Sequence, residues 1–186
     1  NLLVGQVHEG KHIVVVEADE YDRSFLKLYP NIAVITAMDP DHLDIYGDAL
    51  SMEQAFIDFS DQVREGGLLV THASLKRGKE LGKKTALTHL TYALKGPGPD
   101  VYAERLKVEN GAYEFDVIMP GRKLEKVKLN MGGLHNIENA LAAITVASSL
   151  GIDAGRIRVA VENFRGVKRR FEYVLREEKT TFIDDY

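Results

Sequence analysis

The sequence predicts an α/β fold: a mostly parallel sheet flanked by helices, with a small antiparallel, hairpin-rich insert. Two runs of β-branched residues, 13–16 and 32–35, each end abruptly in acidic residues. Such short apolar runs are typical of strands buried on both faces. Between them, residues 24–28 carry a thin helical pattern that Pro30 ends, because a proline disfavours helix in the residue before it. Strand, short helix and strand in this order favour a parallel sheet.

The pattern beyond residue 50 predicts further helices and strands. It indicates a helix over 51–63 with Ser51 as its cap, a third buried strand over 67–71 and a short helix over 75–81. A buried helix follows over 132–151, which is apolar nearly all round and ends at Gly151. The last predicted helix, over 153–164, has Asp153 as its cap and turns Ile157, Val161 and Phe164 inward. Two short apolar runs, 173–175 and 181–183, flank a charged turn near the end.

The stretch from Thr88 to Leu129 has a different texture. Short alternating runs are separated by Gly-Pro-Gly-Pro, Asn-Gly and Pro-Gly turns. This alternation predicts the antiparallel insert, which we expect to be a scaffold element.

Composition narrows the class of protein. With 186 residues and a net charge of −4, the chain has no global basic field that would attract nucleic acid or an anionic membrane. No apolar run approaches the roughly 20 residues that span a bilayer. The chain contains no cysteine, which is typical of a cytosolic protein. It starts without methionine and ends on Asp-Asp-Tyr, so we expect it to be a piece of a longer protein.

Two acidic segments follow the first two predicted strands. Glu17, Asp19, Glu20 and Asp22 come directly after the first, at the strand end where open α/β sheets bind ligands. Carboxylates there suit a hard cation such as Mg²⁺, whereas a solvated acidic loop is the alternative. Glu17 favours the metal because it directly continues the strand.

The second acidic segment is Asp39-Pro-Asp-His-Leu-Asp44. Pro40 holds Asp39 extended, so Asp41, His42 and Asp44 follow from a stiff turn. His42 can bind a metal, and manganese accepts imidazole more readily than magnesium does. A local hydrogen-bonding role for His42 is equally open.

Two further groups carry candidate binding residues. His135 and Asn139 are four residues apart, hence on one helix face, with Asn136 beside them. An asparagine amide offers the donor and acceptor that match the N6 and N7 edge of adenine, although for Asn136 taken alone a role as helix cap is favoured. Arg169 and Arg170 can grip a phosphate or a carboxylate, or remain solvated.

Taken together, the segments EADEYDRSFL, TAMDPDHLDIYG, GGLHNIENALAA, FRGVKRRFE and the terminal DDY resemble the Mur ligase family. The order of these motifs is that of the family, and they cover nearly the whole chain, with 71–129 the least characteristic part. The resemblance implies the central ATP-binding domain over 1–165, and over 166–186 the hinge and first hairpin of the amino-acid-binding domain. The nearest likeness is to the branch that joins L-alanine to UDP-N-acetylmuramate in the synthesis of peptidoglycan precursors.

The resemblance also implies an ATP-dependent, amide-forming ligase with Mg²⁺ or Mn²⁺ as its metal. Glu17 matches the residue that holds the metal on the ATP phosphates, and His42 matches the histidine at a second metal near the acyl-phosphate site. His135 and Asn139 match the adenine contacts, with Asn136 beside them. Arg170, with its neighbour Arg169, matches the arginine that faces phosphate or substrate carboxylate.

The departures from the family pattern limit these expectations. The family's glycine-rich phosphate loop ends in Gly-Lys-Thr or Gly-Lys-Ser, and the sequence contains neither. We therefore expect no ligase turnover from this chain alone. Two alternatives stay open: the recycling ligase that attaches a tripeptide to UDP-N-acetylmuramate, and a non-catalytic nucleotide-binding module.

Overall fold

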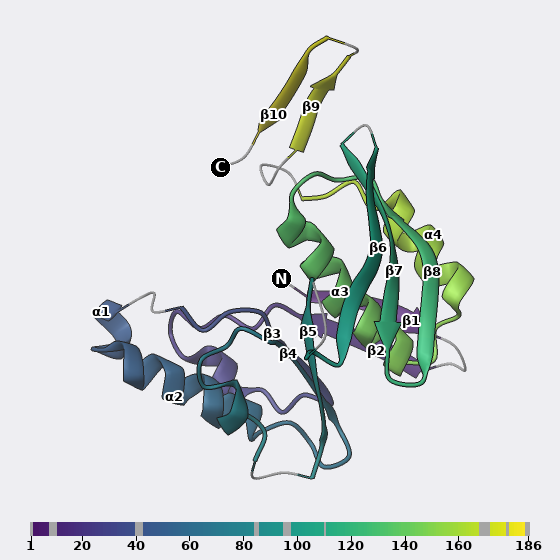
Figure 1. The fold of residues 1–186 in the computed structure, drawn as a ribbon. Helices are drawn as coiled ribbons and strands as arrows, with labels where there is room; N and C mark the ends of the chain where they lie inside the picture. The colour runs from purple at the N-terminus through teal and green to yellow at the C-terminus, as the bar shows by residue number, and fades with distance from the viewer. Residues whose placement is uncertain are drawn as a thin grey trace. The chain divides into compact units, whose positions relative to one another are not determined.

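The computed structural model describes residues 2–7, 11–39, 43–83, 86–94, 98–109, 111–167, 172–177 and 179–184 (Figure 1). The chain divides into two units, Asn1–Tyr92 and Ala93–Tyr186. This division does not test the domain boundary expected at residue 165, which stays a prediction.

A parallel sheet forms the centre of the first unit. Strand β4 (Leu68–His72) pairs in parallel with β3 (Ile32–Ile35) on one side and with β5 (Thr88–Ala93) on the other. Leu69 and Val70 of β4 are fully buried, as expected for a central strand. In β3 only Ala33 and Ile35 are buried, while Val34 is 39% exposed. The expected burial of β3 on both faces is therefore wrong, because one face of this outer strand remains exposed.

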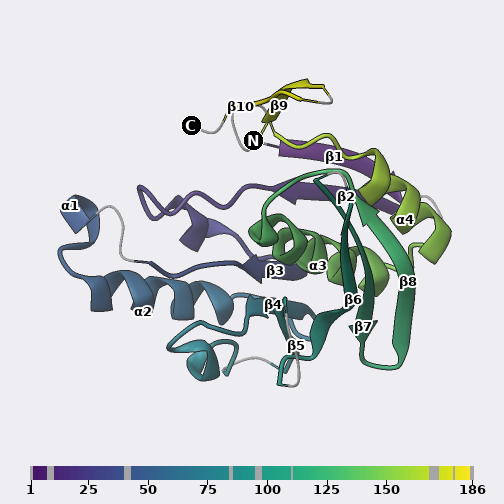
Figure 2. The same cartoon turned by 45° about the horizontal axis from the view of Figure 1, so that its top comes forward.

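Helix α2 (Ala49–Ser60) packs against this sheet (Figure 2). Met52, Ala55 and Phe59 recur at helical spacing and share a buried core with Ala33 and Ile35. A fully buried large apolar side chain such as Met52 or Phe59 stabilises the fold by roughly 1.5–3 kcal/mol.

The cap of α2 differs from the prediction. Asp48, rather than Ser51, is the N-cap residue, and its carboxylate accepts a hydrogen bond from the Ser51 amide at 2.7 Å. Hydrogen bonds from the Ser51 amide and side chain lower the pKa of Asp48. Aspartate and serine are both good caps, so composition alone did not separate them.

The first predicted strand exists but its surroundings differ from the expectation. Strand β2 (Lys11–Val16) pairs antiparallel with β1 (Leu2–Val7) in a separate two-stranded sheet. Val14, Val15 and Val16 are 54%, 59% and 45% exposed. The prediction of a buried strand in the parallel sheet is therefore wrong here. An apolar run specifies an extended backbone, but its partner and its covering layer are set elsewhere in the fold.

Among the described residues of the first unit there are also three short helices: η1 (Ser24–Lys27), α1 (Leu43–Tyr46) and η2 (Gly78–Glu80). Phe25 of η1 is 1% exposed, and the centre of its ring lies 5.4 Å from that of Phe56 and 5.2 Å from that of Phe59. The short helix predicted over 24–28 is therefore confirmed, and it is held by aromatic packing against α2.

The second unit begins with an antiparallel meander of β6 (Val101–Glu109), β7 (Ala112–Met119) and β8 (Arg122–Leu129). The predicted turns between these strands contain Gly111 and Gly121, at φ of +70° and +66°. The predicted insert started too early, because β5 pairs in parallel with β4. Alternation of apolar and polar residues in β5 carries no information on strand direction.

Two helices pack against the meander: α3 (Leu134–Ser149) contacts β6 and β7, and α4 (Ala154–Asn163) contacts β8. Asp153 caps α4 as predicted, accepting hydrogen bonds from the amides of Gly155 and Arg156. Two burial predictions are wrong. Helix α3 is not buried all round, since Leu134 is 53% exposed, and Phe164 after α4 is 49% exposed.

The last described element is a hairpin of β9 (Glu172–Arg176) and β10 (Thr181–Asp184), as the two apolar runs predicted. The α/β class is confirmed: a parallel sheet with flanking helices, followed by antiparallel strands. Within the described residues, no helix has the length and apolar character needed to traverse a lipid bilayer.

Candidate functional site

The acidic loop after β2 is a folded turn. Glu17 is exposed directly after the strand ends at Val16. The Asp19 carboxylate accepts a hydrogen bond from the Tyr21 amide at 3.0 Å, and that of Asp22 accepts one from the Ser24 amide at 2.9 Å. Hydrogen bonds from the Ser24 hydroxyl and amide lower the pKa of Asp22. Asp19 and Asp22 therefore shape the loop, and Glu17 lies ahead of it as a candidate ligand.

A tyrosine joins this loop to the helix that follows the second acidic segment. Tyr46 of α1 is 5% exposed, and its hydroxyl donates a hydrogen bond to the carbonyl oxygen of Glu20 at 2.5 Å. The guanidinium carbon of Arg23 lies 4.8 Å from the centre of the Tyr46 ring. Burial raises the pKa of Tyr46. The segments after β2 and β3 thus meet at Tyr46.

The predicted residue His42 lies outside the described residues, as do Pro40 and Asp41. Arg169 and Arg170 lie outside them too. Their predicted roles stay predictions.

The described residues hold no group of three or more metal-binding side chains. Mg²⁺ is usually held by one or two carboxylates together with water and substrate phosphates. Glu17 fits that donor set by its carboxylate, its exposure and its position after a strand.

The turn before α3 gathers the predicted adenine residues. Gly133 precedes the helix at φ +86° and ψ +123°, a conformation that suits only glycine. A Cβ at Gly133 would lie 2.6 Å from the His135 ring, so glycine lets the ring pack on the backbone. The Asn136 side chain donates a hydrogen bond to the Gly132 carbonyl at 2.7 Å and so closes the turn.

These residues border a cavity of about 900 Å³ between α3 and α4. The cavity lining contains His135, Asn136 and Asn139 as its polar residues on α3, and Arg156 on α4. The rest is apolar: Leu129, Met131, Ala140, Ala143, Ile144, Ala147, Ile152, Ile157, Ala160, Val161, Phe164 and Val167. An apolar pocket with a few converging polar groups is the usual form of a small-molecule site.

No sequence pattern indicated the α4 side of this cavity. Ile157, Val161 and Phe164 have the spacing of an ordinary amphipathic helix, so we expected them to face the core. All three line the cavity, with Val167 beside them, and Phe164 is 49% exposed.

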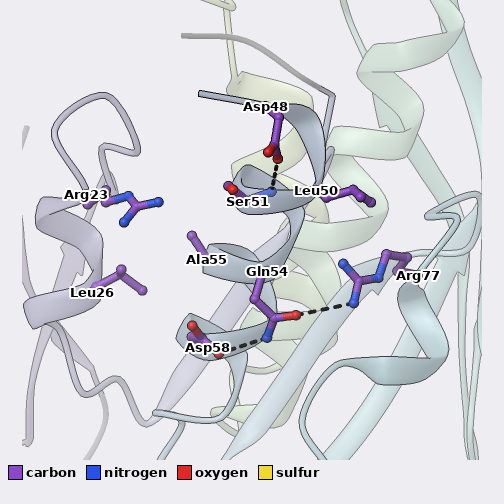
Figure 3. A pocket seen from close by; sticks show the side chains of 9 residues that line it. All are labelled: Arg23, Leu26, Asp48, Leu50, Ser51, Gln54, Ala55, Asp58 and Arg77. Carbon is purple, nitrogen blue, oxygen red and sulfur yellow. Dashed lines mark hydrogen bonds between the residues drawn. The ribbon is translucent and has the colours of Figure 1, made fainter. Parts of the chain in front are cut away.

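A second, more open cavity of about 600 Å³ lies in the first unit (Figure 3). Arg23 and Arg77 point toward α2 from opposite sides of the view. Arg77 is held by a two-pronged contact with Glu80, at 2.9 and 2.6 Å, and Gln54 links Arg77 to Asp58. The remaining lining residues are Leu26, Asp48, Leu50, Ser51 and Ala55. Sequence patterns assigned none of these residues to a binding site, and Arg23 stood out only as part of a longer motif.

The fold defines a class of protein first. The chain resembles the crystal structure of MurF from Acinetobacter baumannii with a TM-score of 0.72, at 22% identity, over 89% of this chain and 36% of that one. It resembles UDP-N-acetylmuramate-alanine ligase from Thermotoga maritima with a TM-score of 0.71, at 30% identity, over 91% of this chain and 37% of that one. The α/β fold is therefore that of the central domain of such ligases.

The family follows from the sequence comparison. The family model described as the Mur ligase middle domain matches residues 1–147, and the chain belongs to the Mur ligase family. Among curated relatives, UDP-N-acetylmuramate–L-alanine ligase of Flavobacterium psychrophilum is 40% identical over 181 residues, which is 97% of this chain and 38% of the relative. The chain thus spans about two fifths of the length of the relatives it matches. The comparisons confirm the resemblance inferred from the motifs.

Proposed function

We propose that this chain is the ATP-binding middle part of a ligase that joins L-alanine to the carboxylate of UDP-N-acetylmuramate. The observation that carries the proposal is the 40% identity to such a ligase over 97% of the chain. The cavity lined by His135 and Asn139 supports it, because these are the residues expected to contact adenine. The cytoplasmic location expected from the sequence stays part of this proposal.

The proposed reaction has two steps. The terminal phosphoryl group of ATP passes to the substrate carboxylate, which gives an acyl phosphate and ADP. The amine of L-alanine then attacks the acyl carbon, the new C–N bond forms, and inorganic phosphate leaves. Positioning and stabilisation of charge provide most of the catalysis in phosphoryl transfer.

In this proposal the cavity between α3 and α4 holds the adenine ring. The side-chain amide of Asn139 offers a donor and an acceptor to the N6 and N7 edge. Ala140 and Ala143 leave room for a flat ring beside the helix. The amide nitrogen of Asn136 is engaged with Gly132, so Asn136 contributes by fixing the turn that carries His135.

Glu17 would hold the Mg²⁺ or Mn²⁺ that neutralises phosphate charge as the phosphoryl group moves. His42 is proposed for the second metal near the acyl phosphate. Arg170, with Arg169, is proposed to face the phosphate or the substrate carboxylate, where a guanidinium binds both oxygens of an anion.

The adenine assignment is tested by Asn139→Ala in the full-length protein, with Asn163→Ala as the control. Asn163 ends α4, is exposed and does not line the cavity. We expect the KM for ATP to rise about ten-fold or more with Asn139→Ala, because a two-pronged asparagine–adenine contact is worth roughly 1–3 kcal/mol and 1.4 kcal/mol is ten-fold. Steady-state kinetics with UDP-N-acetylmuramate and L-alanine measure this. An unchanged KM would remove Asn139 from the site.

The same assay separates the proposed reaction from its alternatives. Phosphate release that depends on L-alanine supports the proposal, whereas dependence on a tripeptide indicates the recycling ligase. Nucleotide binding without turnover under either condition indicates a non-catalytic module.

A further inference from the structure

The contact between Arg23, Tyr46 and the Glu20 carbonyl joins the loop that follows Glu17 to helix α1. Glu17 precedes Glu20 by three residues, and His42 precedes Tyr46 by four. Both sides of the contact belong to the first unit. Whatever fixes Glu20 against Tyr46 therefore also limits where Glu17 can lie relative to α1.

The Glu20 carbonyl is the centre of the contact. It accepts a hydrogen bond from the Tyr46 hydroxyl at 2.5 Å and another from the Arg23 amide at 3.1 Å. A carbonyl oxygen has two lone pairs, and both are used here. Because Tyr46 is 5% exposed, its hydroxyl needs a partner inside the protein, which holds it to this carbonyl.

Arg23 holds the other side of the turn. Its backbone has φ +60° and ψ +17°, a left-handed conformation that is uncommon for a residue other than glycine, asparagine or aspartate. Such strain persists only where the surrounding contacts enforce it, and it gathers at functional sites. This conformation goes with a guanidinium 4.8 Å from the Tyr46 ring centre, within the range of a cation–π contact.

The backbone conformation of the turn does not by itself require an arginine at position 23. Asparagine adopts the left-handed conformation more readily than arginine and would form the same turn. Arginine adds a long cation that reaches the tyrosine and lines the open cavity beside Asp48 and Ser51 (Figure 3). The side chain is therefore used for more than the turn.

We propose that Tyr46 and Arg23 are positioning residues for the metal: together they form a latch that holds the Glu17 loop against the segment after β3. This proposal rests on the proposed function, because it takes Glu17 as the metal-binding carboxylate. Replacing a residue that hydrogen-bonds a metal ligand typically changes metal affinity 10–100-fold, and because Tyr46 acts through the Glu20 carbonyl, three residues from Glu17, we expect an effect at the lower end of this range.

The test uses the full-length protein and Mn²⁺ as the probe. Tyr46→Phe removes the hydroxyl and keeps the buried ring, and Arg23→Asn removes the cation and keeps a residue suited to the turn. Tyr29→Phe is the matched control, since Tyr29 is 63% exposed. Two quantities are measured for each variant: Mn²⁺ binding, from the electron paramagnetic resonance signal of free Mn²⁺, and the Mn²⁺ concentration that gives half-maximal turnover.

We expect Tyr46→Phe to weaken Mn²⁺ binding about ten-fold and to raise the half-maximal Mn²⁺ concentration in parallel, with kcat at saturating Mn²⁺ within a few-fold of wild type. Arg23→Asn changes both in the same direction, and Tyr29→Phe changes neither. A role confined to stability would lower the melting temperature and leave the Mn²⁺ dependence of the folded protein unchanged. Mn²⁺ curves of both latch variants that superimpose on wild type would overturn the proposal.

Glu17→Ala separates failure of the latch from failure of the metal assignment. If Glu17→Ala abolishes Mn²⁺ binding while the latch variants bind normally, the latch is wrong and the proposed metal role of Glu17 stands. If Glu17→Ala itself binds Mn²⁺ like the wild type, the metal assignment of Glu17 is wrong, and the latch proposal falls with it.

Discussion

At the scale of single residues, Gly133 controls the geometry of the α3 entrance. Its backbone, at φ +86° and ψ +123°, suits only glycine, and the His135 ring fills the space that a side chain would need. The expected adenine contact of His135 therefore depends on a residue that does not itself line the cavity. A sequence-based view singles out the histidine and overlooks the glycine two positions before it.

Gly133→Ala should both destabilise the protein and weaken ATP binding, because the methyl group strains the backbone and displaces the His135 ring. Gly121→Ala is the matched control: Gly121 also has positive φ, at +66°, but no atom lies within 4 Å of the position that its methyl group would occupy. A left-handed backbone alone costs an L-residue roughly 1–2 kcal/mol. Urea unfolding and ATP titration should show a stability loss in both variants and weaker ATP binding only in Gly133→Ala. Equal ATP affinity in the two would contradict this account.

At the scale of elements, the meander is distinguished by a buried carboxylate between two irregular strands. Pairing of β6 with β7 shifts register between Glu104 and Lys107, and Arg105 within that shift has φ +53°. On the other side, Lys126 of β8 has φ +54° beside the second register shift. Asp116 of β7 lies between them and is 3% exposed.

Asp116 forms hydrogen bonds with the residue of positive φ at each register shift. It accepts a hydrogen bond from the Lys126 amide at 2.9 Å and one from the Arg105 Nε at 2.6 Å, and Lys123 lies 3.2 Å away. Burial raises the pKa of Asp116, but the hydrogen bonds from Lys126, Arg105 and Lys123 outweigh burial and leave the pKa below its ordinary value. One carboxylate thus stabilises two residues in conformations that L-residues seldom adopt.

Asp116→Asn should destabilise the protein by roughly 1.5–3 kcal/mol, because Asp116 is buried and hydrogen bonds to a charged group are worth about that much, while its partner Arg105 is 60% exposed. A carboxyl group with a depressed pKa contributes stability above its unfolded pKa of about 3.9 and loses that contribution as the pH falls through its folded pKa. The difference between wild type and Asp116→Asn should therefore be constant from pH 5 to 8 and shrink below about pH 4. Denaturant unfolding across this range measures it, with Glu109→Gln, an exposed change in the same sheet, as control. A difference that is independent of pH would mean that charge is not the cause.

The elements that the sequence predicts well are those fixed by local chemistry. The apolar runs indicated β3 and β4, the Asn-Gly and Pro-Gly pairs indicated the turns of the meander, and Asp153 indicated the start of α4. The parallel partner of β5 and the exposure of β2 depend on contacts distant in sequence, so alternation and apolarity alone did not reveal them.

The residues of the candidate site were likewise only partly indicated by the sequence. Helical spacing placed His135 and Asn139 on one face, and both line the cavity. The α4 wall of that cavity carried no local signal, and Tyr46 and Arg23 in the first unit stood out only as parts of longer motifs. Arg23 was hidden because a left-handed conformation is seldom expected at arginine.

At the scale of the whole molecule, the chain covers 38% of a curated relative that it matches over 97% of its own length. The residues proposed for adenine lie in the second unit, and Glu17 lies in the first. A Gly-Lys-Thr or Gly-Lys-Ser phosphate loop, which the family resemblance leads us to expect, is absent from these 186 residues. In the proposed function, phosphate positioning therefore falls to a segment that this sequence does not contain.

The 186-residue chain, purified by itself, should consequently release no phosphate from ATP when UDP-N-acetylmuramate and L-alanine are supplied. The physical reason is that phosphoryl transfer depends on holding the phosphate chain in line with its acceptor, and a misplacement of about 1 Å can cost a hundred-fold in rate. A coupled phosphate assay checks this, with the full-length protein as the positive control and circular dichroism to show that the chain is folded. Alanine-dependent phosphate release by the folded chain would show that the phosphate-binding groups lie within these residues, and the arginines after Val167 would then be the first to replace.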